Sequence, residues 1–224
     1  AALTLSMGNG PLGNYLTGPD GKTLYVFLKD APNTSNCTGA CLQTWPPLLQ
    51  EEDQDVKGAS GVSGKIGYID TAAGEQVTYN GAPLYYFSKD TAPGQTQGNL
   101  VTNLWYVARP ESASTAVVGM RSDNGKSYLV GPTGGTLYLF AKDTDGVTNC
   151  SGSCAQNWPA LTVPQGIDPT AVSSASGSLA VITRDDGSRQ VTYNGKPVYY
   201  YAGDKLPGDT NGDGVGGVWS LAKS

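Results

Sequence analysis

Leu24-Tyr25-Val26-Phe27-Leu28-Lys29-Asp30 is the stretch that decides the fold, because similar heptapeptides begin again at Leu84, Leu137 and Val198. Each copy has a tyrosine, an aromatic residue two positions later and an aspartate three positions after that. Residues i and i+2 share one face of a strand, so each copy sets two rings side by side. This pattern is typical of a packed core strand; a repeated aromatic binding surface is the alternative. The motif residues are Tyr25, Phe27, Asp30, Tyr85, Phe87, Asp90, Tyr138, Phe140, Asp143, Tyr199, Tyr201 and Asp204.

The motif is part of a longer internal repeat. Tyr25 recurs as Tyr138 and Trp45 as Trp158, each 113 residues later. The chain of 224 residues is therefore predicted to be a tandem duplication with halves at 1–112 and 113–224. A fainter period of 60 or 61 residues, from Trp45 to Trp105 and from Trp158 to Trp219, divides the halves. The resulting quarters span about 1–58, 59–112, 113–172 and 173–224.

Turn signals between the apolar runs predict an all-β fold. Asn80-Gly81 and Asn194-Gly195 each precede a motif strand, and Asn-Gly is a strong signal for a tight hairpin. Helix is expected only for a turn or two within 37–44 and 150–157. Four similar antiparallel units, two in each half, fit a small four-bladed propeller-like arrangement in one compact pseudo-symmetric body. Two separate β domains joined near residue 110 are the alternative.

Composition favours an extracellular protein. Charged residues make up 15% of the chain, below the usual quarter, and the net charge is −5 with a pI near 4.6. No basic run is present, which argues against a nucleic-acid partner. No apolar run has the length of a membrane-spanning helix, so no transmembrane segment is expected. Ala1-Ala2 fits the small residues that remain after cleavage of a signal peptide.

Two identical C-x-x-x-C pairs carry all four cysteines of the chain. They predict local disulfides, Cys37–Cys41 and Cys150–Cys154, formed in an oxidising compartment. Redox activity is a second interpretation, although neither surrounding segment contains the Lys or Arg that would favour a thiolate. Zinc binding by four thiolates is a third, and the 113-residue spacing between the pairs argues against it.

Few other residues suggest chemistry. Histidine, the commonest general base, is absent from the sequence. Asp209, Asn211 and Asp213 are spaced like the first ligands of a calcium loop, but Ser220 stands where a bidentate Glu would be needed. The four motif aspartates are expected to accept hydrogen bonds from the backbone of the following turn rather than to act as catalytic pairs. No catalytic residue, cofactor or other metal site is predicted.

The chain resembles a family of secreted repeats and predicted lipoproteins characterised by the Tyr-x-aromatic-x-x-Asp motif. Three kinds of segment carry the resemblance through nearly the whole chain: the motif strands, the cysteine pairs followed by Trp45-Pro46 and Trp158-Pro159, and the Asn-Gly-x-Pro turns. The resemblance implies secretion or surface exposure, and it implies no activity because the family has no agreed function. The chain begins with Ala1 rather than the lipidation cysteine of a lipoprotein, which weighs against a lipid anchor.

These observations favour a non-catalytic extracellular or cell-surface structural or interaction protein, such as a subunit of a surface layer or appendage. Its expected partners are other surface proteins or copies of itself. A glycan- or ligand-binding module that uses the aromatic residues is the first alternative, and a redox protein that uses the cysteine pairs is the second. Asn33, Asn36 and Asn149 lie in sequons for N-glycosylation.

Overall fold

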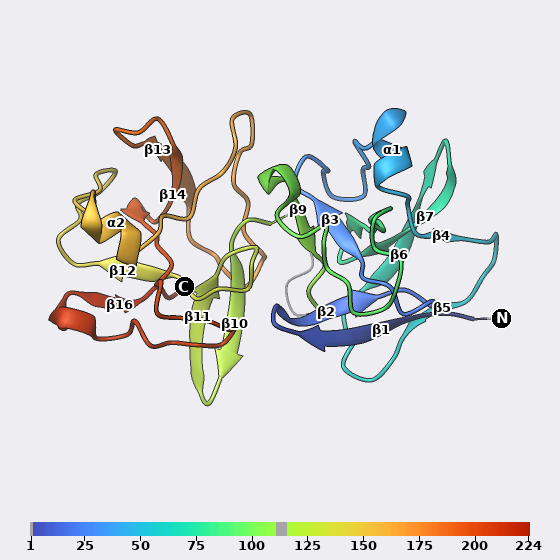
Figure 1. Ribbon diagram of the computed structural model, residues 1–224, viewed down its shortest axis with the longest axis horizontal. Coiled ribbons are helices and arrows are strands. Elements are labelled where there is room, and N and C mark those ends of the chain that lie inside the picture. The colour runs from blue at the N-terminus through green and yellow to red at the C-terminus, as the bar shows by residue number, and fades with distance from the viewer. Residues whose placement is uncertain (1, 111–115) are drawn as a thin grey trace. The chain divides into compact units, whose positions relative to one another are not determined.

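The computed structural model describes residues 2–110 and 116–224, which fall into two compact units, Ala1–Thr115 and Ala116–Ser224 (Figure 1). Both units are built from short strands and turns, so the predicted all-β class with internal repeats is confirmed. The predicted boundary between residues 112 and 113 lies outside the described residues. The four-bladed arrangement and the single pseudo-symmetric body stay predictions.

The first unit contains three small sheets. Their orders are β2-β1-β5, β3-β9 and β4-β7-β6, with β8 also paired to β7. The strands are β1 (Leu3–Gly10), β2 (Gly13–Thr17), β3 (Tyr25–Phe27), β4 (Leu49–Gln50), β5 (Val56–Gly58), β6 (Ile66–Thr71), β7 (Gly74–Tyr79), β8 (Ala82–Pro83) and β9 (Trp105–Val107). The helix α1 (Ala40–Thr44) and the 3-10 turn η1 (Val101–Asn103) complete the unit.

The second unit repeats this plan. Its sheets have the orders β10-β11, β12-β16 and β13-β14-β15. The strands are β10 (Gly119–Asp123), β11 (Lys126–Val130), β12 (Tyr138–Phe140), β13 (Leu179–Thr183), β14 (Arg189–Tyr193), β15 (Lys196–Pro197) and β16 (Trp219–Leu221). The helix α2 (Ser153–Asn157) and the 3-10 turn η2 (Val215–Gly217) match α1 and η1. Both helices therefore fall in the two segments where a helical turn was expected.

The Asn-Gly turns have the backbone that their sequence predicts. Asn80 and Gly81 have φ angles of 51° and 81°, and Asn194 and Gly195 have 49° and 81°. Positive φ at both central residues defines the type I′ turn, whose twist matches that of the flanking strands. These turns set the register of β7 with β8 and of β14 with β15.

Parallel pairing departs from the expected antiparallel plan in both units, and in the second it is an isolated bridge between Val118 and Ala171. β1 runs parallel to β5, with Leu3 opposite Val56 and Leu5 opposite Gly58. Parallel strands need a long crossover, and here the chain forms most of the first quarter between the two strands. No local turn signal marks a pairing across so many residues, so the sequence pattern does not reveal it.

The two quarters of the first unit exchange their tryptophan segments. The motif strand β3 of the first quarter pairs with β9 of the second, which places Phe27 opposite Trp105. In return, the second motif strand bonds to the tryptophan segment of the first quarter, where the Tyr86 amide donates to the Pro46 carbonyl at 2.7 Å. Each quarter therefore completes the sheet of the other.

The motif strands also meet each other directly. In the first unit the backbone amides and carbonyls of Tyr25 and Tyr85 bond reciprocally at 2.8 and 3.0 Å. In the second unit those of Tyr138 and Tyr199 do so at 2.8 and 3.1 Å. The tryptophan segments are exchanged there as well, since β12 pairs with β16 and the Tyr200 amide donates to the Pro159 carbonyl at 2.7 Å.

Both α-helices are five residues long. Across residues 2–110 and 116–224, no helix combines the length and the apolar character that crossing a membrane requires.

Candidate functional site

The motif aromatics of the first unit converge on a pair of stacked tryptophans. The rings of Trp45 and Trp105 lie parallel, with their centroids 3.8 Å apart. Phe27 stacks on Trp105 at 4.2 Å, and Phe87 stacks on Trp45 at 4.4 Å. Tyr85 meets the Trp105 ring edge-on at 5.1 Å. All five rings are buried, so the centre of the unit is an aromatic core to which both quarters contribute.

The second unit has the same core in the same geometry. Trp158 and Trp219 stack at 3.8 Å, Phe140 stacks on Trp219 at 4.3 Å, and Tyr201 stacks on Trp158 at 4.3 Å. Tyr138 is fully buried beside them, whereas Phe140 and Tyr201 are half-buried. The motif rings therefore pack against one another, and they do not form an exposed aromatic surface on either unit.

The motif tyrosines and aspartates bond across the two quarters. The Tyr85 hydroxyl of the second quarter donates to Asp30 Oδ2 of the first at 2.7 Å. The Tyr25 hydroxyl of the first quarter donates to Asp90 Oδ2 of the second at 2.5 Å. In the second unit Tyr199 bonds to Asp143 at 2.6 Å and Tyr138 to Asp204 at 2.7 Å. Each unit thus contains two reciprocal tyrosine–aspartate bonds.

The other carboxylate oxygen of each motif aspartate accepts a backbone amide from the loop that follows. The donors lie six or seven residues further along the chain, and their distances run from 2.6 to 3.1 Å. They are the amides of Asn36, Gln97, Asn149 and Asn211. Each motif aspartate therefore joins its own loop to the opposite quarter, and no two motif carboxylates are arranged as a catalytic pair in these bonds.

Burial shifts the pKa values of aspartates and tyrosines in this hydrogen-bond network. It raises the pKa of Asp30 to about 6, against the opposing effect of the bonds from the Asn36 amide and the Tyr85 hydroxyl. The pKa of Asp143 is raised for the same first reason. Burial also raises the pKa values of Tyr25 and Tyr85, and the neighbouring aspartates raise them further. The tyrosines therefore stay protonated and act as hydrogen-bond donors at neutral pH.

The Asp30 pKa predicts a pH-dependent stability. Because this pKa is higher in the folded chain than its ordinary value of about 3.8, the protonated carboxyl stabilises the fold below pH 4. This contribution is lost as the pH rises from about 4 to 6, and the difference between the two pKa values corresponds to about 3 kcal/mol. Comparing urea denaturation of the wild type and Asp30→Asn from pH 4 to 7 measures it. The difference in unfolding free energy between the two proteins should change over this range; a constant difference would contradict the prediction.

The two predicted disulfides are confirmed. Cys37 is joined to Cys41 and Cys150 to Cys154, with Cα–Cα distances of 5.4 and 5.2 Å. Cys37 and Cys150 are buried in the aromatic cores. Each bridge closes a short loop beside a core tryptophan, and such a loop contributes about 2 kcal/mol through chain entropy.

A cation that was not predicted lies beside the second disulfide loop. Arg184 follows β13 and donates from Nη2 to the Cys150 carbonyl at 2.7 Å and from Nη1 to Gln190 Oε1 at 2.6 Å. A cleft of about 520 Å³ borders it, lined also by Val147, Thr148 and Asp186. Arg184 comes from a hairpin more than 30 residues away along the chain, so the segments around the cysteines give no sign of it.

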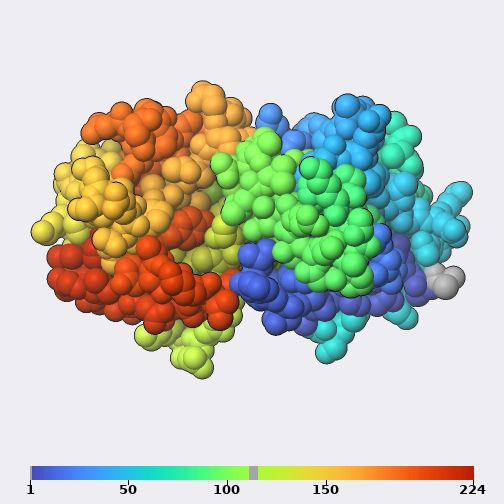
Figure 2. Space-filling model, viewed as in Figure 1, coloured from blue at the N-terminus to red at the C-terminus, as the bar shows by residue number. Residues whose placement is uncertain are grey.

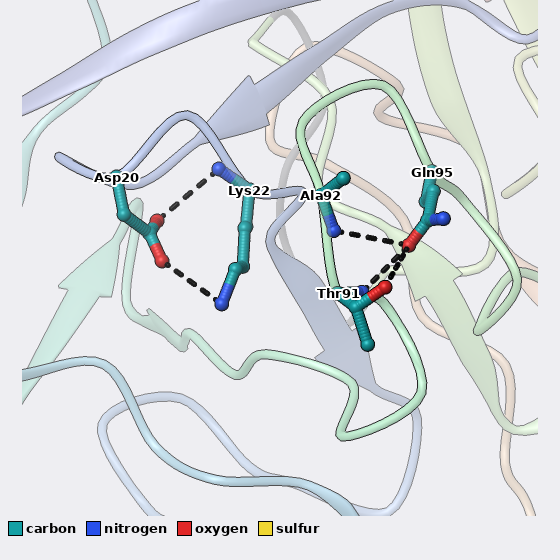
Figure 3. A network of polar contacts seen from close by, with 5 residues as sticks. All are labelled: Asp20, Lys22, Thr91, Ala92 and Gln95. Carbon is teal, nitrogen blue, oxygen red and sulfur yellow. Dashed lines mark hydrogen bonds and ion pairs between the residues drawn. The ribbon is translucent and has the colours of Figure 1, made fainter.

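The loop that contains the three calcium candidates has a counterpart in the first unit. There Gln95, Gln97 and Asn99, which have no carboxylate, make the same hydrogen bonds. Asp209 Oδ2 accepts the amides of Lys205 and Leu206, just as Gln95 Oε1 accepts those of Thr91 and Ala92 (Figure 3). The Asn211 amide donates to Asp204 as the Gln97 amide does to Asp90. Asp213 accepts the Leu221 amide as Asn99 accepts that of Val107. The side chains of Asp209 and Asp213 are thus explained by loop structure, Asn211 contributes its backbone amide, and calcium binding stays a prediction.

This equivalence predicts that Gln can replace Asp209. Asp209→Gln copies the first unit and should change the unfolding free energy by less than about 0.5 kcal/mol. Asp209→Ala removes the acceptor of two backbone amides and should cost about 1 kcal/mol. Urea denaturation without added metal measures both variants. Equal losses in both would show that the carboxylate, rather than a turn-closing acceptor, is needed.

The sequon asparagines also have structural roles. The Asn36 and Asn149 side-chain amides donate to the carbonyls of Lys29 and Lys142 at 2.6 and 2.7 Å. Gln97 makes the corresponding bond to Lys89 without forming a sequon. Asn33 has a φ of 54°, a left-handed conformation that asparagine tolerates well. All three are exposed, and their glycosylation stays a prediction.

A comparison with known protein families divides the chain into the same four quarters. The family described as a secreted repeat of unknown function matches residues 6–49, 67–109, 120–162 and 180–223, one match in each quarter. The chain belongs to this family of secreted repeats. Neither the curated proteins nor the solved structures gave a match. The matched segments of this secreted repeat protein contain the motif strands and all four tryptophans, which are the residues that join its quarters.

Proposed function

We propose that this secreted repeat protein is a non-catalytic structural or interaction protein of the cell surface or extracellular space, and that it serves as a subunit of a surface layer or appendage. Its partners are copies of itself or other surface proteins.

The proposal rests on the structural role of the repeated motif, whose residues hold the quarters together. The four motif tyrosines that start the repeats bond to the four motif aspartates, and the aspartates also hold the loops. The rings that follow stack on the core tryptophans. Disulfides in both units suit an oxidising, extracellular setting. A rigid, duplicated scaffold of this kind supports a role in which the protein meets neighbours.

The state of the protein in its native source tests this proposal. Material taken from the cell surface or medium without denaturant is measured by light scattering and electron microscopy. Polymers, a lattice or a stable complex with other surface proteins are expected. A population of free monomers, or turnover of a substrate by the purified chain, would contradict the proposal.

Ligand binding is the second candidate function, and the cleft beside Arg184 is the observation that favours it. Its lining includes Asp185 and Asp186 together with Val147, which is 50% exposed. A lining that combines polar and apolar side chains suits a sugar or another small polar ligand. A glycan array tests this role, with the double variant Asp185→Ala, Asp186→Ala as the control. Hits that survive the double variant would place the ligand elsewhere.

A further inference from the structure

We infer that β13 is a self-association edge, along which a second copy of this chain adds its own β13 in antiparallel orientation. The inference rests on the proposed function, because it names a contact by which the chain would assemble. β13 is the outer strand of the sheet β13-β14-β15, and its hairpin with β14 ends at the molecular surface (Figures 1 and 2).

The backbone of β13 has hydrogen-bonding groups directed away from its own sheet. On the inner side, the Asn194 amide donates to the Ser178 carbonyl and the Arg184 amide donates to the Ser188 carbonyl. Antiparallel strands alternate bonded and non-bonded residues, so the groups of Leu179, Val181 and Thr183 point outward. Within the described part of the chain, no backbone hydrogen bond or strand pair reaches these outward groups.

β13 also lacks the features by which proteins usually block an edge. Its sequence Leu-Ala-Val-Ile-Thr has no charge and no proline, and its register with β14 is continuous, without a bulge. The equivalent strand β6 of the first unit contains Gly67 and carries a charge at Asp70. Charges and weakly pairing residues protect an edge, so β13 is the more open of the two.

A second copy fits this edge in a symmetric register. When the two strands pair about Val181, Leu179 of each copy lies opposite Thr183 of the other, and Ala180 lies opposite Ile182. Arg184 then lies opposite Ser178, so no like charges face each other. The same residues contribute from both copies, which is the arrangement of a closed two-fold dimer.

The test removes a single backbone N–H donor of β13, one that points away from its own sheet. Val181→Pro deletes the outward Val181 N–H and leaves the bonds of β13 to β14 in place, because proline is tolerated on an edge strand where its nitrogen faces away from the sheet. Tyr68→Pro makes the same change in β6 and is the matched control. Sedimentation equilibrium measures the mass of all three proteins, and thermal unfolding checks that they are folded.

The wild type and Tyr68→Pro are expected to form dimers of twice 23.2 kDa. Val181→Pro should raise the dimer dissociation constant at least tenfold with an unchanged unfolding temperature. A folded wild type that stays monomeric at about 100 μM, or dimers that persist in folded Val181→Pro, would overturn the inference. If Val181→Pro unfolds, Val181→Lys on the same edge replaces it, with the same expected result. Polymers from the native source that persist with Val181→Pro would support the proposed function and reject only this contact.

Discussion

Replacing Trp105 with alanine is expected to lower the unfolding free energy by about 3–5 kcal/mol, the usual cost of truncating a buried tryptophan. Its ring stacks on the rings of Trp45 and Phe27, with centroid distances of 3.8 and 4.2 Å. The Tyr85 ring contacts it edge-on at 5.1 Å. These partners come from both quarters, so the cavity would open where the quarters join. Urea denaturation followed by near-UV circular dichroism measures the loss.

Tyr68→Ala is the control for this variant, because the Tyr68 side chain is 55% exposed and lies outside the aromatic core. Its effect should stay within about 0.5 kcal/mol. Trp219→Ala removes the equivalent ring of the second unit and should cost as much as Trp105→Ala. A loss below 1 kcal/mol for both tryptophan variants would show that the stacked pairs are not the centres of the two units.

Replacing Gly98 with alanine should cost about 3 kcal/mol, at the upper end for overpacking a core. A Cβ at this position would lie 2.8 Å from the Tyr25 ring and 2.9 Å from the Trp45 ring. The Gly98 amide also donates to the Tyr25 hydroxyl at 3.2 Å, so the backbone cannot move away without losing that bond. Gly212 meets Tyr138 and Trp158 at the same distances in the second unit.

Gly10→Ala is the matched control in the first unit. Its added Cβ would lie 3.9 Å from the Tyr15 ring, an ordinary contact, and Gly10 has no left-handed φ. Thermal unfolding of Gly98→Ala, Gly212→Ala and Gly10→Ala compares the three. The first two should unfold several degrees below the wild type. If Gly98→Ala and Gly10→Ala unfold at the same temperature, the close approach of the loop to the core has no energetic importance.

The periodic features of this chain are the ones that its sequence predicts. Spacing alone shows the duplication, and the alternation of aromatic residues shows the motif strands. Asn80-Gly81 and Asn194-Gly195 specify their turns locally, because few other residues accept a positive φ at both positions. The cysteine pairs close over four residues, so their partners are also local.

The long-range pairings follow from no local signal. Nothing in the first quarter indicates that Phe27 pairs with Trp105 rather than with its own Trp45 segment, because the repeat makes the two segments alike. The sequence likewise does not show that Asp30 accepts a hydrogen bond from Tyr85 rather than from Tyr25 of its own motif. Arg184 reaches the Cys150 loop only after the chain has folded. Internal repetition thus identifies the repeats from the sequence. It does not show which motif strand pairs with which tryptophan segment.

Fragment complementation shows whether the two quarters of the first unit exchange their tryptophan segments. Residues 1–58 and 59–110 are prepared separately, with the Cys37–Cys41 disulfide intact, and are studied by circular dichroism and NMR alone and after mixing. Each fragment alone should be unfolded, because each motif strand finds its partner in the other fragment. The mixture should regain the near-UV signal of the stacked tryptophans. A fragment 1–58 that folds cooperatively by itself would show that the first quarter does not depend on the tryptophan segment of the second.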